Sequence, residues 1–405
     1  MLSSFRKART EYPRQFWILF WGLLISTTGA SMIWPFLMVY VSGKLHLPLT
    51  ASATIMTINA AVSILFTFIA GPVTDKIGRK GVMVISLLGN GLVYLLYQGA
   101  STYAQFSIIA GLAGAFNPLF RVGADAMLAD LIPEDKRIDA YSLLRLSNNL
   151  GVAIGPAIGG FMASSSYIIA FFCAAAGMST YGLMMLFLGK ETLPSKLSGL
   201  VKTEQGREKF GGYSIIFRDK PYMQFVLAFA LIQVCAALVW ILLAVYTKQQ
   251  YGIPENQYGF LPTTNGIMIV LFQLGITAWS KKHSSHSMLA IGSAFYGIAT
   301  LSIAFMTGFW GFWISMVLLT FGEMILVPTS STYAANLAPT DMRGRYMSLY
   351  GLTWGISMGI GPVLGGLLSD NFGPRFIWLG GGVIGALSVL AFLALKRKTD
   401  SRGLQ

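Results

Sequence analysis

Long apolar runs alternate with short polar segments along the whole chain. A bilayer core is ~30 Å thick and ~20 residues of helix cross it, so each run predicts a membrane-spanning helix. The first run is too long, and is followed by too many others, to be a cleaved signal peptide. The pattern predicts an all-α polytopic membrane protein. Its twelve expected spans are residues 16–41, 50–74, 81–98, 103–131, 140–164, 167–189, 221–247, 258–279, 287–307, 311–336, 346–368 and 376–395.

One long polar interruption, at residues 190–220, separates six expected helices from the other six. Its mixed charge, Gly and Ser content indicates a cytoplasmic linker. We therefore expect an N-terminal six-helix bundle at residues 1–189 and a C-terminal six-helix bundle at residues 221–405.

The two expected bundles share a repeated segment. Residues 133–160 align without gaps to residues 339–366, with Pro133 opposite Pro339, Arg137 opposite Arg343, and the same GP..GG ending. A parallel duplication in a membrane protein points to a transporter whose substrate site lies near the midplane between the repeats.

The charge of the chain fixes the expected orientation. The chain has 29 Lys and Arg against 16 Asp and Glu, a net charge of +13, and most of the basic residues fall on the side that would hold both termini. By the positive-inside rule both termini are expected in the cytoplasm. Topology and anionic lipid headgroups account for this charge, so no nucleic-acid partner is expected.

The cysteines and histidines offer no expected metal site. Cys173 and Cys235 lie inside apolar spans without partner spacing and are interpreted as packing residues. The three histidines all fall in expected loops.

The segment GPVTDKIGRK places a cluster of charges between the second and third expected spans. A glycine at a helix end allows close helix approach, an aspartate can face a helix N-terminus, a second glycine permits a tight turn, and an arginine can pair with a carboxylate. Asp130, at the end of the fourth span, is the expected partner of that arginine. The residues that carry this chemistry are Gly71, Asp75, Lys76, Gly78, Arg79 and Lys80.

This segment resembles the major facilitator superfamily signature G-x-x-x-D-[RK]-x-G-[RK]-[RK], and every defined position matches. The resemblance implies two six-helix bundles related by pseudo-two-fold symmetry. It also implies that the segment is a cytoplasmic latch that stabilises the outward-facing state and loosens when the transporter opens inward.

The fifth span carries a second motif, GVAIGPAIGG, with Gly151, Gly155, Pro156, Gly159 and Gly160. It provides a face of small residues with a proline bend, which permits tight helix crossing. The motif resembles one associated with drug:proton antiporters of the superfamily. Ordinary helix packing is the alternative, because the second half repeats part of it. The chain also departs from the family, with Ala110 where an R-x-x-Q-G arginine would lie.

Two carboxylates are expected inside the membrane, Asp125 and Glu323. A charge there is expensive, so it must be paired, protonated or in contact with water. Arg121 lies one helical turn from Asp125, and the two form either a static ion pair or a coupling site. Glu323 can load and release a proton, or stay protonated as a packing hydrogen-bond donor. The multidrug branch that this chain resembles places a Gly-Glu pair in the same helix, which favours proton coupling.

The expected substrate is a lipophilic, preferably cationic drug-like compound exported in exchange for protons. A pocket rich in Met and aromatic residues would suit it. A lipid or glycolipid flippase, or a specific metabolite transporter, remains the alternative of the same fold. No catalytic constellation, cofactor or obligate oligomer is expected, since a proton gradient supplies the energy to a monomer. The expected cavity residues are Trp34, Tyr40, Asn59, Phe116, Asn148, Asn149, Trp240, Asn265, Gln273 and Trp354.

Overall fold

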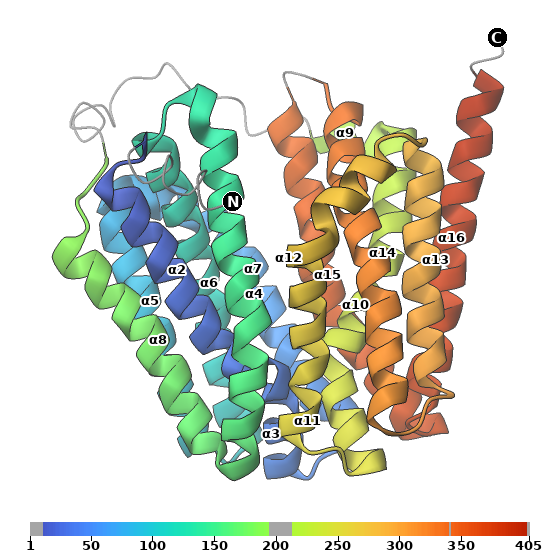
Figure 1. Ribbon diagram of the computed structural model, residues 1–405, viewed down its shortest axis with the longest axis horizontal. Coiled ribbons are helices and arrows are strands. Elements are labelled where there is room, and N and C mark those ends of the chain that lie inside the picture. The colour runs from blue at the N-terminus through green and yellow to red at the C-terminus, as the bar shows by residue number, and fades with distance from the viewer. Residues whose placement is uncertain (1–10, 194–212, 340–341, 403–405) are drawn as a thin grey trace. The chain divides into compact units, whose positions relative to one another are not determined.

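The computed structural model describes residues 11–193, 213–339 and 342–402, and helices make up nearly all of this part of the chain (Figure 1). The described residues contain no strand. The first span consists of α2 (Arg14–Ile33), the 3-10 turn η1 (Trp34–Phe36) and α3 (Leu37–Leu45). The others in the first half are α4 (Leu49–Ile77), α5 (Arg79–Gly99), α6 (Tyr103–Leu131), α7 (Arg137–Ser165) and α8 (Tyr167–Leu188).

The second half begins with the short helix α9 (Tyr213–Arg218), the described end of the expected linker. Residues 194–212 of that linker lie outside the described residues. Six further spans follow. They are α10 (Lys220–Tyr251), α11 (Glu255–Tyr258) with α12 (Phe260–Ser280), α13 (Ser285–Ile303), α14 (Gly308–Leu337), α15 (Arg343–Phe372) and α16 (Phe376–Arg402).

The predicted all-α membrane fold is confirmed. Among the described residues, 11 helical segments are long and apolar enough to cross a membrane. The remaining expected span, α7, is 29 residues long but carries Arg145, Asn148 and Asn149 within its length. These polar residues lower its mean hydropathy. The length of α7, rather than its hydropathy, therefore identifies it as a spanning helix.

Local chemistry explains where several helices begin and end. Pro35 opens the 3-10 turn that bends the first span. Gly78 separates α4 from α5 with φ 95°, a conformation that other residues rarely adopt. Thr102 and Gln105 form a capping box at the start of α6. Gly252 ends α10 in the left-handed conformation.

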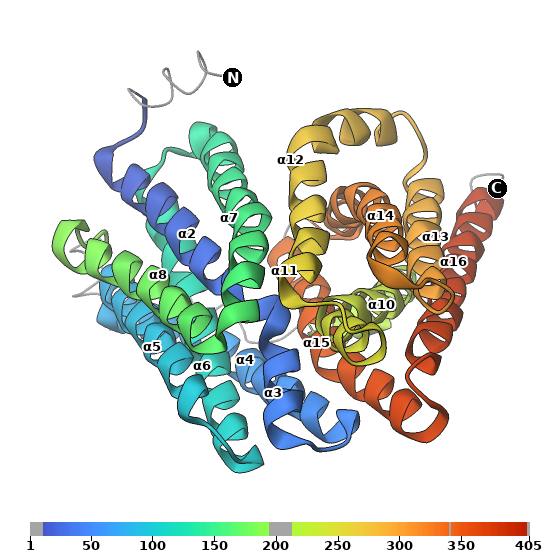
Figure 2. The same ribbon diagram turned by 60° about the horizontal axis from the view of Figure 1, so that its bottom comes forward.

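The chain divides into two compact units, and each is built in the same way. In the first unit α2 packs against α7 and α8, and α5 packs against α6 and α8 (Figure 1). In the second unit α10 packs against α15 and α16, and α13 packs against α14 and α16. There α12 also lies along α14 (Figure 2). Each major helix pair of the first unit therefore has a counterpart in the second, as the repeated segment predicts.

The boundary of the first unit differs from the expected division at residue 189. Residues Met38–Ala60 cluster with the second unit, although the sequence places them in the N-terminal bundle. Hydrogen bonds explain the difference. Asp370 accepts from the backbone N–H of Leu49 at 3.1 Å and of Thr50 at 2.9 Å, and Thr57 donates to the Gly359 carbonyl at 2.6 Å.

Candidate functional site

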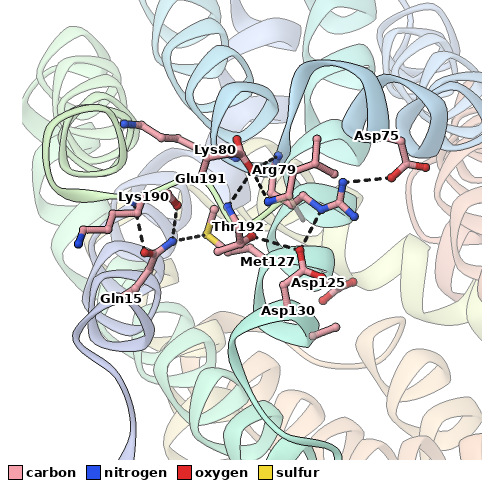
Figure 3. A network of polar contacts seen from close by, with 12 residues as sticks. Gln15, Asp75, Arg79, Lys80, Asp125, Met127, Asp130, Lys190, Glu191 and Thr192 are labelled. Atoms are coloured by element: carbon pink, nitrogen blue, oxygen red, sulfur yellow. Dashed lines mark hydrogen bonds and ion pairs between the residues drawn. The ribbon is translucent and has the colours of Figure 1, made fainter. Parts of the chain in front are cut away.

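Arg79 opens α5 and is the centre of a polar network in the first unit (Figure 3). Its Nε donates to Asp130 Oδ2 at 3.0 Å, and its Nη1 donates to Asp75 Oδ1 at 3.2 Å. The Arg79 side chain is 10% exposed, against 24% for Asp130 and 72% for Asp75. The expected pair between Arg79 and Asp130 is therefore present, and it is the better buried of the two contacts.

The sequence-based interpretation missed two members of this network, Glu191 and Thr192. The Glu191 carboxylate accepts from the backbone N–H of Arg79 at 3.0 Å and of Lys80 at 3.1 Å. It therefore caps the N-terminus of α5 with a negative charge, where helix dipole and free N–H groups favour one. Thr192 donates to Asp130 Oδ2 at 3.2 Å. The first residues after α8 thus bind both the N-terminus of α5 and the Asp130 carboxylate that pairs with Arg79 (Figure 3).

Gly78, at the junction of α4 and α5, and Gly71, within α4, have different surroundings. A Cβ at Gly78 would collide with the Glu191 carboxylate, so the cap itself requires glycine there. A Cβ at Gly71, in contrast, would meet no described atom within 4 Å. The close helix approach expected at Gly71 is not seen. Lys76, also part of the motif, is exposed.

The glycines of the second motif pack α7 against α2. A Cβ at Gly151 would lie 2.8 Å from Thr27 Cβ, and one at Gly155 would lie 2.6 Å from Ser31 Cβ and from the Thr28 carbonyl oxygen. A Cβ at Gly159 would collide with the backbone of Met32. The motif residues Pro156 and Gly160 are buried in the same helix. The face of small residues therefore lies at a close helix contact within the first unit.

Glu323 lies at the midpoint of α14, with 15 residues before it and 14 after it in the helix. At 1.5 Å of rise per residue, about 20 Å of helix lies on each side. Asn265 of α12 donates from Nδ2 to Glu323 Oε2 at 2.8 Å and to Thr320 Oγ1 at 3.0 Å. Asn265 is 2% exposed. Tyr296 of α13, also buried, lies close enough to interact electrostatically with Glu323.

The expected ion pair between Arg121 and Asp125 does not form. Both side chains are described and exposed, and no described hydrogen bond or ion pair joins them. Asp125 also lies only six residues before the end of α6, about 9 Å along the helix axis. It is therefore closer to the membrane surface than the sequence suggested. The i, i+4 spacing permits a pair, and Arg121 interacts electrostatically with Asp125, but no N–O contact within 4.0 Å joins their described side chains.

The expected cavity residues divide between the two units and have different environments. Asn148 accepts from Thr27 at 3.2 Å, and Gln273 donates to Thr277 at 2.9 Å and to the Met324 carbonyl at 3.0 Å. Phe116 fills the space beside Gly89. Tyr40 and Asn265 are buried, Trp34 and Trp354 are exposed, and Asn59, Asn149 and Trp240 are half-buried. Contact with a substrate remains a prediction for all of them.

The described residues form twelve spans, and 11 of them are apolar enough to cross a membrane. These spans form two units that resemble each other, and a charged segment lies between the second and third spans. These features define a multi-pass membrane transport protein. Solved structures agree at the level of fold. A POT family transporter in complex with a thioalcohol-conjugated peptide has a TM-score of 0.79 at 17% identity, covering 95% of this chain and 96% of that one. The chain belongs to the Major Facilitator Superfamily, whose family model matches residues 19–254 and 225–404.

Sequence relatives include efflux and antiport proteins. A Na(+), Li(+), K(+)/H(+) antiporter of Planococcus maritimus is 26% identical over 410 residues, covering 94% of this chain and 95% of the relative. The quinolone resistance protein NorA of Staphylococcus aureus is 22% identical over 382 residues, covering 93% and 96%. The resemblance to the drug:proton antiporter branch is thus consistent with its relatives.

Proposed function

We propose that the protein is a proton-coupled antiporter that exports lipophilic, cationic compounds by alternating access, with Glu323 as its coupling carboxylate. The observation that carries the proposal is the hydrogen bond from buried Asn265 to Glu323 at the midpoint of a membrane helix. A carboxylate at that depth is costly unless it has a function or a partner. Here it has a partner that fixes its position without neutralising its charge.

The hydrogen-bond directions around Glu323 support this proposal. Thr320 donates its hydroxyl proton to the Met316 carbonyl at 2.7 Å, so its oxygen can only accept from Asn265. The Asn265 amide must therefore present its NH₂ group, whose second hydrogen faces Glu323 Oε2. Protonation removes the charge, which lowers the cost of keeping the carboxyl group buried while access to the site changes from one side of the membrane to the other.

The network around Arg79 is proposed to act as the conformational latch of the transporter. Two carboxylates hold its guanidinium group, and Glu191 holds its backbone N–H. These contacts fix the junction between α4 and α5, which lies in the cytoplasm if both termini are cytoplasmic. Loosening them would allow α4 to change its angle to α5 during transport.

The proposal is tested by transport in liposomes. Purified protein is reconstituted, a pH gradient is imposed, and movement of ethidium is followed for wild type, Glu323→Gln and Asp125→Asn. We expect Glu323→Gln to abolish gradient-driven movement while ethidium binding persists, because glutamine keeps the Asn265 contact but cannot carry a proton. Asp125→Asn is the matched control, since it also removes a carboxylate from a membrane helix but nearer the helix end. Undiminished gradient-driven transport by Glu323→Gln would exclude Glu323 as the coupling group.

Exchange of monovalent cations for protons is a second candidate. The similarity to a Na(+), Li(+), K(+)/H(+) antiporter favours it, and so does the oxygen-bearing cluster of Glu323, Thr320 and Asn265. The same liposomes distinguish the two functions when the ethidium is replaced by Na⁺, Li⁺ or K⁺ and proton release is recorded. Movement of metal cations alone would replace the drug substrate in the proposal. Movement of neither, by folded protein, would favour a lipid or a specific metabolite.

A further inference from the structure

A cavity of about 210 Å³ opens where α12 ends and α13 begins, in the second unit. Its volume is several times the ~30 Å³ that one water molecule occupies in the liquid. Its lining reaches Pro328, five residues after Glu323 in α14, but it contains none of the residues of the proposed coupling site. Its lining residues are Thr277, Ser280, Lys281, His283, Ser285, Pro328, Thr329 and Thr332.

The hydrogen-bond donors of this cavity are concentrated on the side of α12 and α13. Thr277 accepts from Gln273, which leaves its hydroxyl proton able to donate. His283 Nδ1 faces the Trp279 carbonyl oxygen at 3.1 Å and must donate to it, so Nε2 is directed elsewhere. On the opposite wall, Thr329 and Thr332 give their protons to backbone carbonyls. A ligand here therefore meets donors and a positive charge from one side.

Ser280 provides an independent sign that the cavity is built for a ligand. It lines the cavity, it is 6% exposed, and its Oγ has no hydrogen-bond partner among the described residues. A buried hydroxyl group without a partner costs about 1–3 kcal/mol. A ligand that brings an acceptor oxygen would remove that cost.

The charge of the surrounding residues and the nearby helix end indicate that the ligand is negatively charged. The connection from Ser280 to Ser285 carries Lys281, Lys282 and His283 and no carboxylate. It leads into the N-terminus of α13, where Ser284 Oγ accepts from the Ser287 N–H. Such an end favours anions, and phosphate above all.

The cavity lies at the end of a spanning helix, where lipid headgroups are expected. It is formed at a helix end, and the neighbouring Trp279 is 45% exposed, as expected of an aromatic residue at a membrane–water interface. Basic residues at that level attract anionic lipids, at roughly 1 kcal/mol for each Lys or Arg.

We propose that this cavity binds a phosphate group, held by Lys281 and by the hydroxyl groups of Thr277, Ser280 and Ser285. The group belongs either to the headgroup of an anionic phospholipid or to a free phosphate compound from the adjoining solution. The inference does not depend on the transported compound, since the site lies outside the proposed coupling site.

Native mass spectrometry of the full chain tests the lipid source. The protein is equilibrated with phosphatidylglycerol and with phosphatidylcholine, and retained lipid is counted for wild type, Ser280→Ala, Lys281→Gln and Lys282→Gln. We expect preferential retention of phosphatidylglycerol, reduced by Lys281→Gln more than the roughly fivefold that loss of general attraction by one basic residue explains, because a direct contact is lost as well. Lys282→Gln is the matched control, since it removes the same charge one residue away but does not line the cavity.

A second arm titrates inorganic phosphate into the detergent-purified protein and follows binding by phosphorus NMR. Binding of phosphate that Ser280→Ala and Lys281→Gln weaken, without preferential lipid retention, would assign the site to a free phosphate compound. Equal losses in Lys281→Gln and Lys282→Gln would overturn the proposal, because general surface charge would then explain the retention. Absence of binding in both arms, by protein with an unchanged unfolding temperature, would also overturn it.

Discussion

The Arg79 network makes a quantitative prediction, because Arg79 contacts two carboxylates of very different exposure. Replacing Arg79 by Gln and each carboxylate by Asn gives two double-mutant cycles, one with Asp130 and one with Asp75. Each cycle isolates the energy of one contact, since the single variants report the loss of the other interactions of each residue. Asp→Asn preserves the side-chain shape and removes only charge, whereas Arg79→Gln also shortens the side chain.

The geometry of the two contacts sets the expected energies. The Arg79–Asp130 contact is 3.0 Å long between side chains that are 10% and 24% exposed. Hydrogen bonds to charged groups in such surroundings contribute about 1.5–3 kcal/mol. The Arg79–Asp75 contact is 3.2 Å long, but Asp75 is 72% exposed. Exposed ion pairs contribute about 0.2–1 kcal/mol. We therefore expect a coupling energy for Asp130 at least about twice that for Asp75.

The free energy of unfolding of the purified protein, measured by denaturant titration in mixed micelles with tryptophan fluorescence, provides both coupling energies. The comparison is internal, because both cycles share the Arg79→Gln variant and the same micelle. Equal coupling energies, or a larger one for Asp75, would refute the argument that burial decides the strength of this network.

Two further predictions concern packing and capping in the first unit. Glu191→Ala should lower the free energy of unfolding by about 1 kcal/mol, the usual value of a helix cap. Glu134→Ala should change it little, because the Glu134 side chain is 88% exposed; equal effects in a denaturant titration would contradict the capping role. Gly155→Ala should destabilise the protein by about 1–3 kcal/mol, because its Cβ would lie 2.6 Å from atoms of α2. Gly351→Ala is its control, with no atom within 4 Å of the new Cβ and the same gain in helix propensity; similar unfolding temperatures for the two variants would count against tight packing at Gly155.

The fold could be predicted from the sequence because the bilayer imposes it. Apolar runs of sufficient length can only be spanning helices, and the segment repeated at residues 339–366 already indicated two similar units. The span at α7 was found despite its polar residues because it follows the same spacing as the others. The assignment of Met38–Ala60 to a unit could not be predicted, because it depends on contacts such as the cap that Asp370 provides to α4.

Contacts in the candidate sites could be predicted only where a local sequence motif contained one of the partners. The contact between Arg79 and Asp130 followed from a motif and from the end of a helix. The Glu191 cap could not be found in the same way, because Glu191 is 112 residues from Arg79 in the chain. Asn265 was expected to face a substrate cavity, but its hydrogen bonds place it beside Glu323. Its sequence neighbours gave no indication of this, since the partner belongs to another helix.

In the packing beside Glu323, corresponding helix pairs of the two units keep their contact although the residues that form it differ. At the same spacing that relates residues 133 and 339, Gly89 corresponds to Phe295 and Phe116 corresponds to Gly322. In the first unit the Phe116 ring of α6 fills the space beside Gly89 of α5. In the second unit Gly322 of α14 lies against Phe295 of α13, with their roles exchanged. Because the large residue has moved to the other helix, α14 approaches α13 closely at the turn that carries Glu323, and the buried Tyr296 comes within reach of that carboxylate. Complementary volume, rather than residue identity, is therefore what the two units share at this contact, and the next position along the helix carries Asn117 in the first unit and Glu323 in the second.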